Sequence, residues 1–251
     1  MNKPLISIIT PCYNASRFVA QTIESVRQQT YKNWELIIVD DCSTDNSIEV
    51  IQSYVNNDSR IRLCQLPTNT GSPAAPRNKA IELSKGEILA FLDADDLWMP
   101  QKLEVQLKYM LDNDCDIVYS NGNMVNEDGK FLRSMTKTKW VDYRKTLQHD
   151  ELSCSSVMIK KNLLNDSHFV KQPKEDLIFW LDVLKKTGAK AFNVNESLYA
   201  YRVVSNSRSR DKKAIIKHQW RILREVEKLS FPYAAYNFLW YIWINLKKYY
   251  L

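Results

Sequence analysis

The sequence lacks the patterns that mark several classes of protein. Its five cysteines are an odd number with no CxxC spacing, which argues against a disulfide framework and against a zinc site. No run of about 18 apolar residues is available to span a membrane, and the first apolar stretch is too short for a signal peptide. No repeat or low-complexity segment is present. We therefore expect a protein of the reducing cytoplasm.

The composition fits one enzyme-sized unit. With 251 residues, of which 45% are hydrophobic, the chain can bury a sizeable core. Its net charge of +6 suits an acidic partner, such as a nucleotide or an anionic lipid surface. Nucleic acid would also suit this charge, but the sequence carries no signature of a nucleic-acid-binding module. We expect no nucleic-acid partner.

Apolar runs alternate with amphipathic segments in the first half of the chain. Strands are predicted over residues 5–10, 34–40, 60–66, 87–93 and 115–120, and helices over 17–29, 45–55, 75–84 and 101–112. This alternation predicts an α/β fold with a mostly parallel sheet. Beyond Gly122 the chain reads as polar and irregular to about Asp150, followed by a strand over 155–160 and a helix over 175–187.

Polar side chains follow three of the predicted strands. The first strand ends in Pro11-Cys12-Tyr13-Asn14, the second in Asp40-Asp41-Cys42-Ser43, and the fourth in Asp93-Ala94-Asp95-Asp96. In an open parallel sheet, ligands bind beyond the carboxyl ends of the strands. A tyrosine offers a flat face to a nucleobase, an aspartate accepts from an imide N–H, and a DxD pair provides oxygen ligands for a divalent cation. The pattern predicts a nucleotide and metal site.

The stretch AFLDADDLW places three carboxylates within four positions directly behind an apolar run. Clustered carboxylates repel one another unless a cation neutralises them or water solvates them, and Mg²⁺ or Mn²⁺ bridging two phosphates would supply that cation. Alternatively, the acids cap the following helix, which would account in part for Asp96. The motif alone leaves both interpretations open, and the other two polar strand ends favour the cation.

Longer stretches carry a family resemblance. The runs SIITPCYNASRFVAQTIESVRQQTYKNWELIIVDDCSTDNS and NTGSPAAPRNKAIELSKGEILAFLDADDLWMPQKL resemble the family 2 glycosyltransferases of GT-A fold, and LSCSSVMIKK, KEDLIFWLDVLKKTG and LYAYRVVSNSRS extend the match to about residue 210. The bacterial branch that assembles teichuronic acid, capsule and O-antigen is the most similar. The resemblance implies a Rossmann-like sheet with helices on both faces. It also implies inverting transfer from a UDP-sugar to a glycan or lipid-linked acceptor, with Mn²⁺ or Mg²⁺.

The resemblance also implies roles for individual residues. Donor-site positions are Pro11, Tyr13, Asp41, Arg77, Asp93, Ala94 and Asp95. Tyr13 would stack on the uracil, and Asp41 would accept from its imide N–H. Asp95 would ligate the metal directly, with Asp93 nearer the ribose or a coordinated water. Asp176 matches the catalytic base, although from position alone it is ordinary acidity at a helix N-terminus.

The resemblance further implies a division of the chain. Residues 1–121 would bind the nucleotide-sugar, 122–210 would bind the acceptor and carry the base, and 211–251 would form a C-terminal helical extension. Residues 122–150 and 153–157 would line the acceptor side. A single in-line displacement requires no enzymic nucleophile, so no second catalytic carboxylate is expected. Cys42 stands where many relatives have glycine, which matters only if that turn requires a positive φ.

Two basic segments leave alternatives open. Arg202, Arg208 and Arg210 lie in a segment that reads either as a mobile flap closing on phosphates or as a solvated loop. The C-terminal segment 231–251, with Trp240, Tyr241, Trp243 and terminal lysines, reads either as an anchor at the inner face of the cell membrane or as a helix packed on the core or on a dimer partner.

Two other functions share parts of the pattern. A non-catalytic nucleotide-sugar-binding subunit would keep the donor residues, but it would need neither the metal motif nor Asp176. A nucleotidyltransferase shares a Rossmann-like sheet, but the first strand is not followed by a Gly-rich loop bearing Arg or Lys to hold a triphosphate. We therefore favour the glycosyltransferase interpretation.

Overall fold

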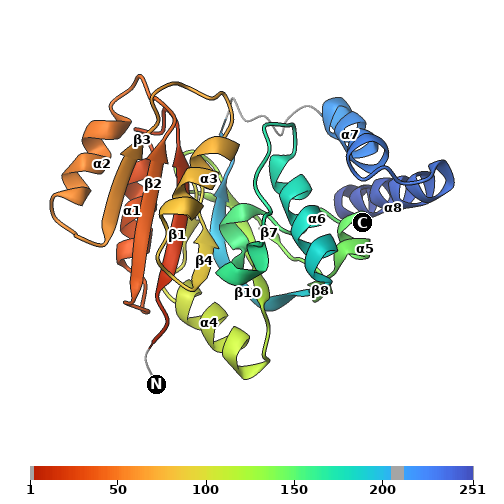
Figure 1. The fold of residues 1–251 in the computed structure, drawn as a ribbon, viewed down its shortest axis with the longest axis horizontal. Helices are drawn as coiled ribbons and strands as arrows, with labels where there is room; N and C mark the ends of the chain where they lie inside the picture. Colours follow the sequence, from red (N-terminus) through yellow and green to blue (C-terminus); the bar gives the residue numbers. More distant parts are fainter. Residues whose placement is uncertain (1–2, 205–211, 251) are drawn as a thin grey trace.

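A single mixed sheet organises the computed structural model, which describes residues 3–204 and 212–250 (Figure 1). The strand order is β3-β2-β1-β4-β9-β6-β10-β5, with β7 paired to β6 and β8 paired to β10. The strands are β1 (Ile6–Cys12), β2 (Trp34–Asp40), β3 (Ile61–Gln65), β4 (Ile88–Phe91), β5 (Leu97–Trp98), β6 (Ile117–Val125), β7 (Phe131–Met135), β8 (Trp140–Val141), β9 (Met158–Lys160) and β10 (Ala191–Arg202).

Most strands on this path run in one direction. Strands β3, β2, β1 and β4 are mutually parallel. Strand β9 is antiparallel to both β4 and β6, so β6 runs in the same direction as β4 and β1. Strand β10 is parallel to β6 and therefore also runs in this direction. The prediction of a mostly parallel α/β sheet is confirmed. The carboxyl ends of β1, β2, β4, β6 and β10 consequently lie along one edge of the sheet.

Helices cover both faces of the sheet (Figure 1). They are α1 (Val19–Arg27), α2 (Ser47–Val55), α3 (Ala74–Leu83), α4 (Lys102–Asp112), α5 (Tyr143–Thr146) and α6 (Glu175–Thr187), with short 3₁₀ turns at Cys154–Ser156 and Lys161–Leu164. Successive strand residues alternate between two cores: Ile8 packs with α1 and α4, whereas Ile9 packs with α3 and α6. Because both faces of the sheet are covered, every residue of β1 and β2 is buried, and most of them are apolar.

The C-terminal extension is helical, as predicted. It comprises α7 (Lys212–Arg221), a π-helical turn at Ile222–Val226 and α8 (Phe231–Tyr250). Ile222, Leu223 and Ala234 share a buried cluster with Leu177 and Leu181 of α6. The division of the chain at residues 121 and 210 stays a prediction. Within the described ranges, none of the helices combines the length and hydrophobicity needed to cross a bilayer.

The segment predicted to be irregular between Gly122 and Asp150 is in fact ordered. It contains the end of β6, both short strands β7 and β8, and helix α5. Gly122 lies inside β6, opposite Tyr199 of the neighbouring β10. Glycine is needed there because a Cβ would come within 2.4 Å of the Tyr199 ring. The glycine marks a close contact between strands rather than the end of one.

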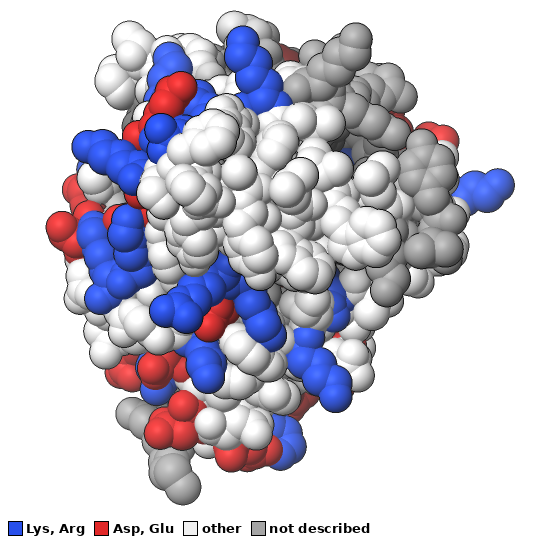
Figure 2. Space-filling model, turned by 90° about the vertical axis from the view of Figure 1, so that its right-hand side faces the viewer, with Lys and Arg blue, Asp and Glu red and all other residues white. Residues whose placement is uncertain are grey.

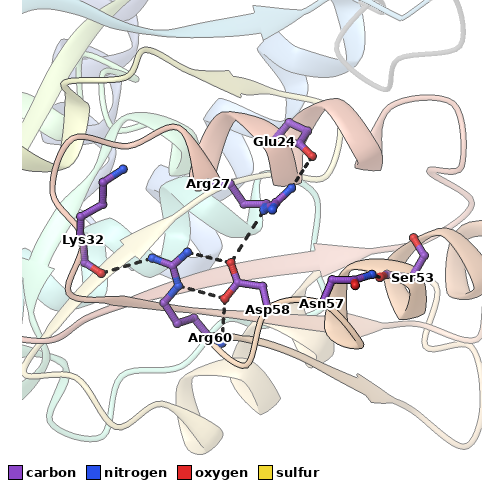
Figure 3. Close-up of polar contacts among 7 residues, drawn as sticks. All are labelled: Glu24, Arg27, Lys32, Ser53, Asn57, Asp58 and Arg60. Atoms are coloured by element: carbon purple, nitrogen blue, oxygen red, sulfur yellow. Dashed lines mark hydrogen bonds and ion pairs between the residues drawn. The ribbon is translucent and has the colours of Figure 1, made fainter.

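A polar network at the opposite end of the sheet from the proposed site is structural (Figure 3). Arg60 Nη2 lies 2.7 Å from Asp58 Oδ2, and Arg27 on α1 lies 3.8 Å from the same oxygen. Arg60 also donates to the carbonyl of Lys32, over 3.5 Å. These contacts join the last turn of α1 to the turn between α2 and β3, and the Arg60 side chain lowers the pKa of Asp58.

Candidate active site

Hydrogen bonds join the loops that follow β1 and β2. Asn14 N donates to Ser43 Oγ over 2.9 Å, and Asn14 Oδ1 accepts from Thr44 N over 2.8 Å. Asn14 adopts φ +47, a conformation that asparagine tolerates better than most residues. This loop presents Tyr13, whose side chain is 51% exposed at the edge of the sheet. A large aromatic face is therefore available to a flat ligand such as a nucleobase.

Asp41 is buried beside Tyr13, where the β2 end meets β1. Its backbone N–H donates to Cys12 O over 2.8 Å. Its Oδ1 accepts from Thr70 N over 2.9 Å and from Thr70 Oγ1 over 2.8 Å. Among the residues that the structure describes, no donor bonds Oδ2. The carboxylate is thus oriented by one oxygen and keeps the other to accept from a ligand.

The loop after β4 concentrates three carboxylates. Burial and the nearby charge of Asp93 raise the pKa of Asp95 to about 6. Asp96 is fully buried, and its burial together with Asp95 and Asp93 raises its pKa well above the usual range. Asp96 was expected to cap α4 in part. This expectation is wrong, because Gln101 occupies the N-cap and Asp96 Oδ1 instead accepts from the backbone N–H of Arg202 over 3.0 Å.

Arg202 fixes the backbone of this loop. It is the last residue of β10, and its side chain is buried. Its Nε donates to Asp95 O over 2.8 Å, and Nη1 donates to Glu127 O over 2.6 Å. The flap interpretation is therefore wrong for Arg202, whose guanidinium is held by fixed acceptors. Arg208 and Arg210 lie outside the described residues.

Two donor-site candidates serve through their backbones. Pro11 is buried in β1 opposite Val39, where it shapes the strand end that leads to Tyr13. Ala94 is buried between the two aspartates of the DxD motif, and its carbonyl accepts from Thr22 Oγ1 on α1 over 2.9 Å. The same hydroxyl lies 2.9 Å from Asp96 O. Helix α1 thus fixes the backbone of the carboxylate loop through the Thr22 hydroxyl.

Arg77 connects the carboxylate loop to α6. This buried side chain of α3 places Nη2 2.6 Å from Asp93 Oδ1 and Nη1 3.4 Å from Glu175 Oε1. Burial alone would lower its pKa, but the Asp93 and Glu175 carboxylates more than offset that effect and raise it. Its buried Nε has no hydrogen-bond partner in the described structure. The guanidinium fixes two acids that are 82 positions apart in sequence.

Asp176 lies in the first turn of α6, next to Glu175. Its Oδ1 accepts from the backbone N–H of Leu177 over 2.8 Å. Burial, Asp150 and Glu175 raise the pKa of this carboxyl to about 7, while Arg77 partly offsets them. A carboxylate with a pKa near neutrality is matched to accepting a proton at physiological pH.

Lys174 connects the start of α6 to the C-terminal helices α7 and α8. It occupies the N-cap in the left-handed conformation, with φ +60. Its Nζ lies 3.0 Å from Asp150 Oδ2, 3.2 Å from Gln219 Oε1 on α7 and 3.4 Å from the Tyr241 hydroxyl on α8. One ammonium therefore holds two C-terminal helices and an acidic loop against the helix that carries Asp176.

A cavity of about 620 Å³ lies between α8 and the segments predicted to line the acceptor side. Its wall combines aromatic and polar side chains: Thr136, Lys137, Thr138, Gln148, His149, Glu151, Tyr236, Trp240, Trp243 and Ile244. His149 and Glu151 flank Asp150, the partner of Lys174. Aromatic faces with a few polar groups suit a saccharide.

The carboxylate loop fits a divalent cation that is shared with a phosphate ligand. Within the described residues, no three His, Cys, Asp or Glu side chains form a ready cluster for a metal ion. Mg²⁺ characteristically takes only one or two protein carboxylates and completes its shell with water and substrate phosphates. Burial and the charge of Asp93 raise the pKa of Asp95, although Arg202 and Arg77 partly offset them, and a bound cation would favour the ionised form of this carboxyl.

The sequence comparisons assign the family. The family model for Glycosyl transferase family 2 matches residues 7–166, which include the ends of β1, β2 and β4. The chain belongs to glycosyltransferase family 2. It is 38% identical over 251 residues to the putative teichuronic acid biosynthesis glycosyltransferase TuaG of Bacillus subtilis, with 98% of each chain covered. It is 36% identical to the UDP-Glc:alpha-D-GlcNAc-diphosphoundecaprenol beta-1,3-glucosyltransferase WfgD of Escherichia coli, covering 99% of this chain and 96% of that one.

Solved structures share the fold of this glycosyltransferase. TarS 1–349 of S. aureus in complex with UDP-GlcNAc superposes with a TM-score of 0.72 at 22% identity, covering 94% of this chain and 71% of that one. The mannosyltransferase PcManGT of Pyrobaculum calidifontis, in complex with GDP-Man and Mn²⁺, gives 0.69 at 16% identity, covering 96% and 69%. The GT-A fold is therefore confirmed.

Several residues of this glycosyltransferase site were not predicted individually, although Asp150 and Ser155 lie in the segments predicted to line the acceptor side. No role was predicted for Glu175, yet it holds Arg77. Ser155 Oγ accepts from the backbone N–H of Asp93 over 3.1 Å, from within the LSCSS run of the resemblance. Lys174 and Asp150 had no signal beyond their charge, because their pairing depends on the chain folding back over 24 residues.

Proposed function

We propose that this glycosyltransferase transfers a sugar from a UDP-sugar to a lipid-linked saccharide, with inversion and with a divalent metal, in the assembly of a bacterial surface polysaccharide. The observation that carries the proposal is the Arg77 bridge. It joins Asp93 of the carboxylate loop to Glu175, which is next to Asp176 in sequence. Arg77 thereby holds the loop proposed to face the diphosphate close to Asp176, the proposed base, whose pKa is about 7.

The donor's uridine would bind at the ends of β1 and β2. The exposed Tyr13 ring would stack on the uracil, and Asp41 would accept from its imide N–H through the oxygen that Thr70 leaves unengaged. TarS, which shares this fold, was solved in complex with UDP-GlcNAc. Similarity of fold together with this polar strand edge supports a UDP-sugar for the present chain.

Asp176 would act as the general base. A sugar hydroxyl is too weak an acid to attack at neutral pH, so a carboxylate must accept its proton as the new bond forms. The pKa of about 7, raised by burial and by Asp150, makes Asp176 a stronger base than an ordinary aspartate while leaving it substantially ionised at physiological pH. Attack on the face opposite the leaving diphosphate inverts the anomeric carbon in one step.

Asp95 would hold the divalent cation, with Asp93 nearby and oriented by Arg77. When bound, the metal supplies Lewis-acid stabilisation of the departing diphosphate. Arg202 would keep the Asp95 backbone in place throughout, because it bonds the Asp95 carbonyl and the Asp96 carboxylate from β10. The PcManGT structure contains Mn²⁺, which supports a divalent metal for this fold.

The acceptor would be a saccharide on a lipid diphosphate. The name of WfgD specifies an N-acetylglucosaminyl diphosphoundecaprenol acceptor, and the two proteins align over nearly their whole lengths. The cavity beside Asp150 has the aromatic and polar lining that a saccharide requires. We therefore propose that the protein works as a peripheral protein on the inner face of the cell membrane.

Release of UDP from a panel of UDP-sugars, with Mn²⁺ or Mg²⁺ present, tests this function directly. Wild type should release UDP from one donor, and Asp95→Ala and Asp176→Asn should lose about a hundredfold or more of that rate. Asp176→Asn should still bind UDP in calorimetry. Because water can replace the acceptor, slow donor hydrolysis is measurable without it.

Two other outcomes would count against the proposal. UDP binding without hydrolysis or transfer by the wild type, including with an N-acetylglucosaminyl diphosphate bearing a lipid chain, would favour a non-catalytic nucleotide-sugar-binding subunit. Absence of UDP binding would contradict the donor assignment altogether.

A further inference from the structure

Helix α8 presents an uncharged apolar face to solvent. The sequence carries no charged residue from Phe231 to Leu246. Along this stretch the exposed large side chains are one to three positions apart: Phe231, Tyr233, Tyr236, Leu239, Trp240, Trp243 and Leu246. Leu239 is 68% exposed and Trp243 58%. Such exposure of contiguous large apolar groups marks an interaction surface.

The opposite side of α8 fixes which face is presented. Ala234, Asn237 and Tyr241 are buried against the body of the protein, so the prediction that Tyr241 belongs to the membrane anchor is wrong. Asn237 Oδ1 accepts from Gln148 Nε2 over 2.9 Å, and the Tyr241 hydroxyl contacts Lys174 Nζ. Rotation of the helix about its axis would break these contacts. The apolar stripe is therefore a fixed part of the molecular surface.

Basic side chains border this face. Figure 2 shows the side of the molecule on which α7 and α8 lie, with a broad uncharged surface in the middle and Lys and Arg side chains along its left and lower margins, with a few acids among them. Lys137 lines the same cavity as Tyr236, Trp240 and Trp243, so a cation lies beside the exposed aromatic side chains of α8. An apolar centre with a basic rim complements an anionic bilayer, whose headgroups meet the cations while its interface receives the aromatic rings.

We propose that the exposed face of α8 docks this protein on an anionic lipid bilayer, with the helix lying in the plane of the interface. This docking specifies how the membrane contact of the proposed function would be made, and it rests on that proposed function. Tyr236, Trp240 and Trp243 also line the cavity beside Asp150. A saccharide carried on a membrane lipid would thus reach the cavity from the surface on which its lipid is held.

A second copy of the chain fits this surface less well than a bilayer does. A symmetric dimer formed through the apolar face would bring the two basic rims together, where like charges repel. Tryptophan and tyrosine together are also enriched where an apolar phase meets water, because their rings have one polar group each. Charge and composition therefore favour lipid.

Co-sedimentation of the full chain with vesicles tests this docking. The probes are vesicles of phosphatidylcholine alone and of phosphatidylcholine mixed with phosphatidylglycerol. Wild type should bind the anionic vesicles, more weakly as salt is raised. The double variant Leu239→Ser with Trp243→Ser should bind them about tenfold or more weakly. Leu111→Ser on α4 is the matched control, because Leu111 is 66% exposed but lies on another helix, and its binding should not change.

UDP binding is measured on the same samples and should be equal in all three proteins. If UDP fails to bind wild type, the proposed function fails, whereas normal UDP binding without vesicle binding overturns only the docking. Equal vesicle binding by wild type and the double variant would also overturn it. So would a dimer of wild type in sedimentation velocity that dissociates in the double variant, since α8 would then be covered by a second copy.

Discussion

At the scale of residues, the site is a chain of paired charges. Asp93 pairs with Arg77, Arg77 with Glu175, and Lys174 with Asp150. Asp176 lies among them without a salt bridge to a cation in the described structure. Burial is the first cause of its raised pKa and the charges of Asp150 and Glu175 add to it, so its proton affinity depends in part on how well these two acids are neutralised.

This arrangement predicts how the rate depends on pH. The groups that face Asp176 are Asp150, Glu175, Cys154, Lys174 and Arg77. Because the base must be ionised, UDP release by wild type should decline below about pH 7. Asp150→Asn removes a charge that raises the pKa of Asp176, so the decline should move to lower pH. Lys174→Met leaves Asp150 without its partner, so the decline should move to higher pH.

The double variant Asp150→Asn with Lys174→Met supplies the control for this prediction. With both charges removed, the pH at half-maximal rate should return toward that of the wild type. The rate of UDP release is measured across pH for the four proteins, alongside UDP affinity. Identical profiles in all four would show that Asp176 does not limit the rate in this pH range. A fall in rate with no shift in pH would mean that Lys174 acts only on structure.

The sequence allowed prediction of site residues that directly follow a strand, because that position places them at the ligand-binding edge of the sheet. Asp41, Asp93 and Asp95 follow apolar runs, so their placement at the sheet edge follows from the strand pattern. Arg202 could not be read in that way. Its partners Asp95 and Asp96 are more than 100 positions away, and only the pairing of β10 with β5 and β6 brings them together.

At the scale of elements, the turn between β2 and α2 contains a side chain in a conformation that favours glycine. Cys42 has φ +62, so the turn requires a positive φ at this position, and glycine adopts that conformation more readily than any residue with a Cβ. For a residue with a Cβ this conformation costs about 1–2 kcal/mol. Glycine avoids most of that cost, although it loses more chain entropy on folding.

We therefore predict that Cys42→Gly stabilises the protein. The free energy of unfolding should rise by about 0.5–1 kcal/mol, measured by urea denaturation. Cys42→Ala is the control, because it removes the same thiol without relieving the backbone, and it should bring no gain. UDP affinity should be unchanged in both variants, since Asp41 keeps its bonds to Thr70. Stabilisation by alanine as large as that by glycine would attribute the effect to the side chain.

Most elements of the first half were predicted to within a few residues, because β1 and β2 are mostly apolar and the helices α1, α2 and α4 are amphipathic. Strand β10 was not predicted. Its sequence AFNVNESLYAYR mixes Asn193, Asn195 and Glu196 with apolar residues, and its pairing with β6 shifts register between Asn193 and Ser197. An irregular strand of this kind has no simple period, so its existence depends on the neighbours that hold it.

At the scale of the whole molecule, the C-terminal extension is built into the site. Lys174 connects α6 to α7 and α8 through its ammonium, and α8 forms one wall of the cavity beside Asp150. The same helix exposes the apolar face proposed to meet the bilayer. The helix proposed to meet the bilayer is thus coupled to the helix of the proposed base by the contact between Tyr241 and Lys174.

That packing predicts a single cooperative unfolding transition for the entire chain. Leu223 in the C-terminal extension is fully buried in the cluster that includes Leu177 and Leu181 of α6. Leu223→Ala should lower the free energy of unfolding by about 2–4 kcal/mol through the cavity it leaves. The loss should appear equally in far-UV circular dichroism and in tryptophan fluorescence, since seven tryptophans are distributed along the sequence. Leu246→Ala, on the exposed side of α8, should change it by no more than about 0.5 kcal/mol. Two separate transitions, of which UDP raises only one, would instead make α7 and α8 an independent unit, and the coupling of the membrane face to the base would be lost with it.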